Sequence, residues 1–121
     1  MTTLPTAPVF ADFSQIAPVP CPCGQAQRGL MTPDNHLCSL HTVEISVNAR
    51  THYHRDHVEV YYFLEGAGEL ELDGVRHPVR PGQAVLIPTG VRHRAIVPPG
   101  GRMRILNYVT PPFDVADEHF D

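Results

Sequence analysis

Prolines and glycines interrupt this chain so often that no long regular element can form in it. Thirteen of the 121 residues are proline and nine are glycine. Proline lacks a backbone donor and breaks helices, and it is excluded from central strands as well. The chain is therefore cut into short segments, and its length suits one domain with one core. We expect a single domain without long helices.

Several of these segments alternate apolar and polar residues with a period of two. Val43, Ile45 and Val47 alternate with polar neighbours, as in a half-buried strand. Asp73-Gly74 is a strong hairpin signal because glycine accepts the positive φ that a tight turn needs. Further strands are predicted at residues 52–65, 69–72, 84–87, 93–97 and 103–109. Many short strands separated by turns predict an all-β sandwich or closed barrel.

The first 22 residues differ from the rest because they contain five prolines. We expect an extended N-terminal arm over residues 1–22, with at most one short helical turn around residues 10–16. The barrel domain is predicted to span residues 23–121.

Composition excludes several classes of protein. Hydrophobic residues make up 42% and charged residues 18%, which is a normal globular balance. The net charge of -4 offers no basic surface for nucleic acid. No apolar run reaches the ~18 residues of a membrane span, so no membrane partner is expected and the prediction is a cytoplasmic protein. Three cysteines, Cys21, Cys23 and Cys38, fit reduced thiols better than disulfides, and a zinc site on them lacks an obvious fourth ligand.

Four residues in two separate stretches predict a metal site. His52 and His54 are two apart on a predicted strand, so both rings project from the same face. Glu59 joins them only if a bulge or turn at residues 55–57 resets the phase of the strand. His93 follows the turn at residues 88–90 and can face the same interior. Three imidazoles and one carboxylate suit one divalent ion of iron, manganese, zinc, nickel, cobalt or copper.

These residues occur in two motifs that resemble those of the cupin superfamily. The family's first motif is Gly, five residues, His-x-His, three or four residues, Glu, six residues and Gly. Here Ser46 is followed by His52-Tyr53-His54, Glu59 and Gly66 at that spacing. The second motif is Gly, five residues, Pro-x-Gly, two residues, His, three residues and Asn. Here Gly82 is followed by Pro88-Thr89-Gly90, His93 and Val97.

The resemblance implies a jelly-roll barrel, a double-stranded β-helix, whose interior holds the metal on His52, His54, Glu59 and His93. Small members of the family are often dimers. The departures from the motifs are Ser46 and Val97, which replace the opening glycine and the closing asparagine. Neither position supplies a metal ligand in the family, so the ligand set is complete.

A second family shares part of the first motif. His52-Tyr53-His54-Arg55-Asp56-His57 also resembles the His-x-His-x-Asp-His zinc motif of metallo-β-lactamases. That fold needs about twice this length and a helix directly after the motif. Residues 58–64 are instead β-branched and aromatic, which favours a strand. The cupin interpretation is therefore preferred.

Three more residues are candidate catalytic groups. Arg50 shares the predicted inward face with His52 and could clamp a substrate carboxylate or phosphate, although a solvated position at a loop edge is the simpler interpretation. Tyr61 could donate a hydrogen bond within the site or serve as a core aromatic. His57 is predicted at the rim, where it could shuttle protons or simply be a surface residue. The isolated histidines at 36, 41, 77 and 119 are expected to be surface or hydrogen-bonded residues.

Two functions fit these observations. The first is a metal-dependent enzyme, a dioxygenase or an isomerase, acting on a small oxygenated and possibly anionic substrate. The second is a non-catalytic module that binds a small ligand such as a sugar or metabolite. A homodimer is predicted separately, because Val58, Val60, Tyr62 and Leu64 form an outward apolar row.

Overall fold

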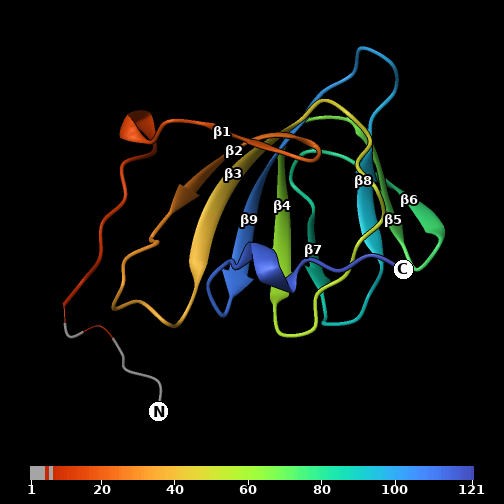
Figure 1. Ribbon diagram of the computed structural model, residues 1–121. Coiled ribbons are helices and arrows are strands. Elements are labelled where there is room, and N and C mark those ends of the chain that lie inside the picture. The colour runs from red at the N-terminus through yellow and green to blue at the C-terminus, as the bar shows by residue number, and fades with distance from the viewer. Residues whose placement is uncertain (1–4, 6) are drawn as a thin grey trace.

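The computed structural model describes residue 5 and residues 7–121, which form two antiparallel β-sheets (Figure 1). The larger sheet has six strands, which lie in the order β1 (Val19–Cys21), β2 (Gly24–Gly29), β3 (Ser39–Ile45), β9 (Met103–Thr110), β4 (Val58–Gly66) and β7 (Ala84–Ile87). The smaller sheet contains β6 (Val75–Val79), β5 (Gly68–Leu72) and β8 (His93–Ile96). Two 3-10 helices, η1 (Phe13–Gln15) and η2 (Val115–Asp117), complete the elements of the described residues. The fold is an all-β jelly-roll barrel, as predicted.

The inward-facing residues of the two sheets build one core. Alternate residues of each strand point inward because side chains along a strand change sides with a period of two. Phe63 and Ile105 from the larger sheet and Leu70 from the smaller sheet are each at most 1% exposed. This core fills one part of the barrel, and the histidines of the predicted metal site lie in another part of the same interior.

The hairpin predicted at Asp73-Gly74 is confirmed. Both residues have positive φ, 48° for Asp73 and 83° for Gly74, and they join β5 to β6. Two positive φ values give a turn whose twist matches that of the flanking strands. Pro78 lies in β6, which is an edge strand and therefore does not need every backbone donor.

The prediction of one strand over residues 52–65 is wrong in its first half. Regular pairing of β4 begins only at Val58, and His52 and Tyr53 form isolated bridges to His93 and His119. The chain bends at residues 55–56, where a phase reset was required. The strand that follows the bend agrees with the cupin interpretation and not with the helix that a metallo-β-lactamase would have there.

Two strands near the N-terminus were not predicted. β1 begins inside the segment expected to be an extended arm, and it forms a hairpin with β2. The predicted helical turn is present as η1, and Gln27 of β2 donates hydrogen bonds to the carbonyl oxygens of Phe13 and Ile16. Residues 1–4 and 6 of the predicted arm lie outside the described residues.

The C-terminal segment packs beside the segments that carry the histidines of the predicted metal site. After η2, His119 pairs with Tyr53 through backbone hydrogen bonds, and Asp121 forms an ion pair with Arg92 at 2.8 Å. Figure 1 shows this segment passing in front of the strands before it ends beside the smaller sheet. No helix among the described residues is long and apolar enough to cross a membrane.

Candidate metal centre

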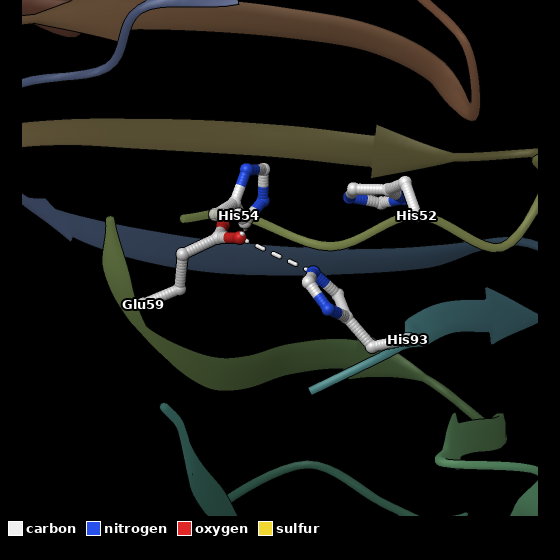
Figure 2. A group of neighbouring side chains, drawn as sticks. All are labelled: His52, His54, Glu59 and His93. Carbon is white, nitrogen blue, oxygen red and sulfur yellow. Dashed lines mark hydrogen bonds and ion pairs between the residues drawn. The ribbon is translucent and has the colours of Figure 1, made fainter. Parts of the chain in front are cut away.

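The structure brings together the four residues predicted to bind a metal (Figure 2). His52 and His54 come from the segment before β4, Glu59 from β4 and His93 from the start of β8. One ligand atom from each lies within 4.8 Å of the others. His54, Glu59 and His93 are at most 7% exposed, and His52 is partly buried. Residues from two separated stretches therefore converge on one point inside the barrel.

Backbone carbonyl groups orient all three imidazoles in the same way. Nδ1 lies 2.8 Å from the Asp117 carbonyl oxygen in His54 and 2.8 Å from that of Val91 in His93. In His52 the corresponding distance to the Arg50 carbonyl oxygen is 3.4 Å. A carbonyl oxygen only accepts, so Nδ1 carries the hydrogen and Nε2 keeps its lone pair. Each ring therefore offers Nε2 as a ligand atom, as metal-binding histidines do.

The spacing of the polar atoms fits a bound cation. Nε2 of His54 lies 2.5 Å from Oε1 of Glu59, and Nε2 of His93 lies 3.2 Å from the same oxygen. The His54 Nε2 atom is buried and forms no hydrogen bond of acceptable geometry. Two acceptors this close repel each other unless a proton or a cation lies between them. Ligand atoms around an ion at about 2.1 Å are separated by roughly 3 Å, so this cluster could hold a metal ion.

Burial and charge set the protonation of these groups. Burial lowers the pKa of His52 to about 4, so the ring is neutral and ready to coordinate at neutral pH. Burial also disfavours a charged Glu59, but its close interactions with His54 and His93 outweigh this cost and hold its pKa well below the ordinary value. Burial opposes protonation of His54 as well, yet the Glu59 carboxylate raises its pKa overall. A carboxylate therefore stays ionised in the buried site and attracts positive charge.

Asn107 and Tyr61 extend the site and face it from neighbouring strands. Asn107 of β9 donates a hydrogen bond of 2.5 Å from Nδ2 to Oε2 of Glu59, which leaves Oε1 for the histidines. The Tyr61 ring packs edge-on against His93 with centroids 6.1 Å apart. Burial raises the pKa of Tyr61 well above 10, so its hydroxyl keeps its proton. Sequence analysis missed Asn107, because a single asparagine in a strand carries no motif.

Two of the three candidate catalytic residues do not line the cavity, and Arg50 has the solvated position that was its simpler interpretation. Arg50 is exposed, its guanidinium lies 4.6 Å from the Phe120 ring centroid, and it donates to the Asp121 carbonyl oxygen at 2.9 Å. His57 was expected at the rim but is only 2% exposed, with Nδ1 3.4 Å from the Asp117 carboxylate. The bend at residues 55–56 separates His57 from the alternation of the preceding segment, and Arg50 lies before regular strand pairing begins at Val58, so period two did not apply to it. Tyr61 alone faces the cavity beside the metal cluster.

A cavity of about 90 Å³ lies beside the cluster. Its walls include His52, His54, Glu59 and Tyr61, together with the residues Cys21, Cys23, Arg28, Asn107 and Phe113. All three cysteines are free, and the sulfur atoms of Cys21 and Cys23 are 3.5 Å apart. A cavity of this size accepts a small molecule or several waters.

A larger groove of about 360 Å³ lies elsewhere, lined by residues such as Gln25, Glu44, Glu65 and Arg102. Glu44 and Arg102 form an ion pair with each other there, and both are well exposed. The groove contains no buried cluster of ligating side chains among the described residues. We therefore assign the chemistry to the smaller cavity.

Comparisons with known proteins agree with this geometry. The model of the cupin domain family matches residues 40–109. Protein SchB of Streptomyces halstedii is 54% identical over 72 residues, which are 55% of this chain and 52% of SchB, so the chain spans about half the length of that relative. An L-ectoine synthase of Mycolicibacterium vanbaalenii is 32% identical over 98 residues, covering 78% of this chain and 74% of the synthase.

Among solved structures, a protein from Planctomyces limnophilus is 42% identical with a TM-score of 0.87. The superposition covers 95% of this chain and 98% of that one. The family model covers more than half of the chain, and the two motifs, the jelly roll and the converging histidines all lie within or beside the matched region. This chain belongs to the cupin family.

Proposed function

We propose that this protein is a metal-dependent enzyme that acts on a small oxygenated substrate. The observation that carries the proposal is the convergence of His52, His54, Glu59 and His93, whose ligand atoms lie within 4.8 Å of one another. A bound divalent ion would polarise a substrate oxygen and so supply Lewis-acid chemistry. Four protein ligands leave coordination positions open on an ion that prefers six. The resemblance to L-ectoine synthase is a further support for an enzyme.

Of the two enzyme types, dioxygenase and isomerase, Tyr61 favours the isomerase, which works by proton transfer. Its hydroxyl stays protonated, faces the cavity, and makes no hydrogen bond to another described residue. Such a group can donate a hydrogen bond or a proton to a substrate oxygen. Tyr61 is therefore proposed as the general acid, and Asn107 as the residue that orients Glu59.

The metal part of the proposal is tested by loading the chain with iron, manganese, cobalt, nickel, copper and zinc in turn. We expect one ion per chain, and loss of that ion in His52→Ala and Glu59→Gln. The exposed histidine variant His77→Ala is the matched control and should bind like the wild type. Retention of metal by Glu59→Gln and His52→Ala at wild-type affinity would contradict the site.

The catalytic part is tested with small oxygenated compounds on the loaded protein. Tyr61→Phe should keep the metal and lose turnover by about 10²- to 10⁴-fold, the usual contribution of general acid catalysis. Oxygen consumption that accompanies turnover would identify a dioxygenase instead. An ion without exchangeable water, and no turnover of any compound class, would favour the non-catalytic binding module.

We also propose that the protein is a homodimer formed through the outer face of the larger sheet. Tyr62, Leu86 and Tyr108 are 42%, 63% and 41% exposed. Val60 pairs with both Leu86 and Tyr108, so these side chains form one apolar patch across β7, β4 and β9. Leu86→Lys should shift sedimentation from dimer to monomer, whereas Val75→Lys on the smaller sheet should not. A monomeric wild type at micromolar concentration would contradict this proposal.

A further inference from the structure

Arg28 lines the same cavity as the metal cluster, although it lies far from the motifs in sequence. Strand register shows why it faces inward. Arg28 of β2 pairs with His41 of β3, His41 pairs with Asn107 of β9, and Asn107 pairs with Tyr61 of β4. Residues directly opposite each other on antiparallel strands share a face of the sheet. Since Tyr61 and Asn107 face the cavity, Arg28 faces it too.

The Arg28 guanidinium is held by an aromatic ring and not by an acid. Its central carbon lies 3.9 Å from the centroid of the Phe113 ring, a cation–π contact that fixes the plane of the group. Nη1 makes one long contact of 3.5 Å to Nδ1 of His41. Burial lowers the pKa of His41 to about 4, so this neighbour is a neutral ring. The stacked guanidinium therefore keeps N–H donors available along its edge.

Arg28 is alone among the arginines of residues 5 and 7–121 in being partly buried without a carboxylate within 4.0 Å. Ion pairs to Asp or Glu are formed by Arg76, Arg92, Arg94, Arg102 and Arg104. The other three arginines are exposed: Arg50, Arg55 and Arg80. A cation withdrawn from water is costly unless an anion or strong acceptors compensate it.

The acidic groups near Arg28 do not compensate its partly buried charge. The carboxylate oxygens of Glu59 already contact His54, His93 and Asn107. The hydrogen bond from Cys23 is the main reason that the pKa of Cys21 falls to about 6, and the charge of Arg28 adds to this effect. Glu118 also lines the cavity but forms no ion pair with Arg28, so a Cys21 thiolate and the Glu118 carboxylate are the internal anions that compete for Arg28.

We propose that Arg28 binds a carboxylate of the substrate while the oxygenated reacting end of the same molecule lies at the His52, His54, Glu59 and His93 cluster. The inference rests on the proposed function and narrows its substrate to small carboxylic acids. It also moves the anion-binding role predicted for Arg50 to a residue that faces the cavity. A planar guanidinium matches a carboxylate through two parallel hydrogen bonds. The cavity volume of about 90 Å³ favours a carboxylate over a bulkier phosphate ester.

The test is calorimetric titration with straight-chain carboxylates of two to six carbons, each paired with its neutral primary amide of the same shape. The full chain is used both metal-loaded and metal-free. Wild type should prefer a carboxylate over its amide by roughly 10- to 100-fold, as expected for hydrogen bonds to a charged group. Arg28→Gln should lose this preference, Arg28→Lys should keep part of it, and Arg50→Gln should behave like the wild type.

Three results would overturn the inference. One is an unchanged carboxylate preference in Arg28→Gln, which would mean that the carboxylate binds the metal directly. Another is loss of the preference in Cys21→Ser, a variant that removes the competing thiolate and should strengthen carboxylate binding. The third is tighter binding of inorganic phosphate or of methyl phosphate than of any carboxylate by the wild type.

Metal content separates this inference from the proposed function. Arg28→Gln should bind one ion per chain with wild-type affinity, because Arg28 touches none of the four ligands. If the wild type and the Arg28 variants bind metal normally, His52→Ala and Glu59→Gln lose it, and only the carboxylate preference is absent, the anion site is wrong and the metal-dependent enzyme stands. If His52→Ala and Glu59→Gln retain the metal while the preference depends on Arg28, the metal site is wrong and the anion site stands.

Discussion

The Nδ1 atom of His54 lies 2.8 Å from the backbone carbonyl oxygen of Asp117, which is 63 residues further along the chain. The Asp117 carboxylate binds the backbone that directly follows His54. It accepts hydrogen bonds of 2.9 Å from the backbone N–H groups of Arg55, Asp56 and His57. These bonds outweigh the cost of burying the acid and lower the pKa of Asp117. One C-terminal residue thus fixes both the ring orientation of a ligand and the bend that follows it.

Replacement of Asp117 by asparagine should weaken metal binding. The amide of Asp117→Asn cannot accept all three backbone bonds, so the bend at residues 55–56 is weakened, and the backbone carbonyl of residue 117 that orients His54 is less firmly held. Partners that orient ligands in this way typically contribute about 10- to 100-fold to metal affinity. Competition with a metal-binding dye would measure the change.

Asp114→Asn is the matched control for this variant. Asp114 is exposed and caps η2 by accepting a bond of 2.9 Å from the Ala116 N–H. Asparagine caps a helix about as well as aspartate, so this variant should keep both its stability and its metal affinity close to the wild type. Equal metal affinities for Asp117→Asn and the wild type would show that the C-terminal segment does not support the site.

Asn107 provides a second test, now on the carboxylate ligand. Asn107→Leu removes the bond of 2.5 Å to Oε2 of Glu59, so the carboxylate is free to rotate. A hydrogen bond to a charged group contributes about 1.5–3 kcal/mol, and we expect the metal affinity to fall by roughly tenfold or more. The control is Asn48→Leu, which removes the bond of 2.8 Å from the Val97 N–H but lies outside the cavity. Equal affinities for the two variants would contradict the role of Asn107.

The metal cluster was predictable because its information is local. His52 and His54 lie two residues apart, and Glu59 and His93 occur at fixed distances inside two motifs with turn residues. The phase reset at residues 55–57 followed from the odd spacing between His54 and Glu59. Strand boundaries followed from alternation and from breakers such as Asp73-Gly74, with the exception of the segment before Val58.

The rest of the site depends on contacts between distant segments. His57 is buried because Asp117 approaches it from a segment 60 residues away. Arg28 enters the cavity only through the register of β2 with β3. Arg50 was extrapolated from period two, but regular pairing does not begin until Val58, so the alternation did not apply to it. No local residue pattern predicts such contacts between segments that are distant in the sequence.

His41 should make the metal-free protein less stable as the pH falls below 6.5. The ring is fully buried, and burial together with the charge of Arg28 lowers its pKa to about 4. In the unfolded chain a histidine titrates near 6.5, so between about pH 6.5 and 4 the unfolded state binds more protons. Stability therefore falls with decreasing pH in this window, by about 2–3 kcal/mol from this group.

Urea unfolding at several pH values, with a chelator present, measures this effect. His41→Gln should show a smaller slope of unfolding free energy against pH in that window, whatever its absolute stability. His52 and His54 are present in both proteins, so their titrations cancel in the difference. Parallel slopes would mean that His41 is protonated equally in the folded and unfolded states.

Gly66 and Gly74 form a pair that separates backbone strain from crowding. Their φ angles are 80° and 83°, so alanine at either position adopts a conformation that L-residues rarely occupy. A Cβ at Gly74 meets nothing within 4 Å, whereas one at Gly66 overlaps the carbonyl oxygen of Arg102 on the paired strand. We expect Gly74→Ala to cost about 1 kcal/mol and Gly66→Ala about 3 kcal/mol or more, since the clash adds to the φ cost. Denaturant unfolding of both variants measures the difference, and equal losses would show that β4 and β9 separate easily at this point.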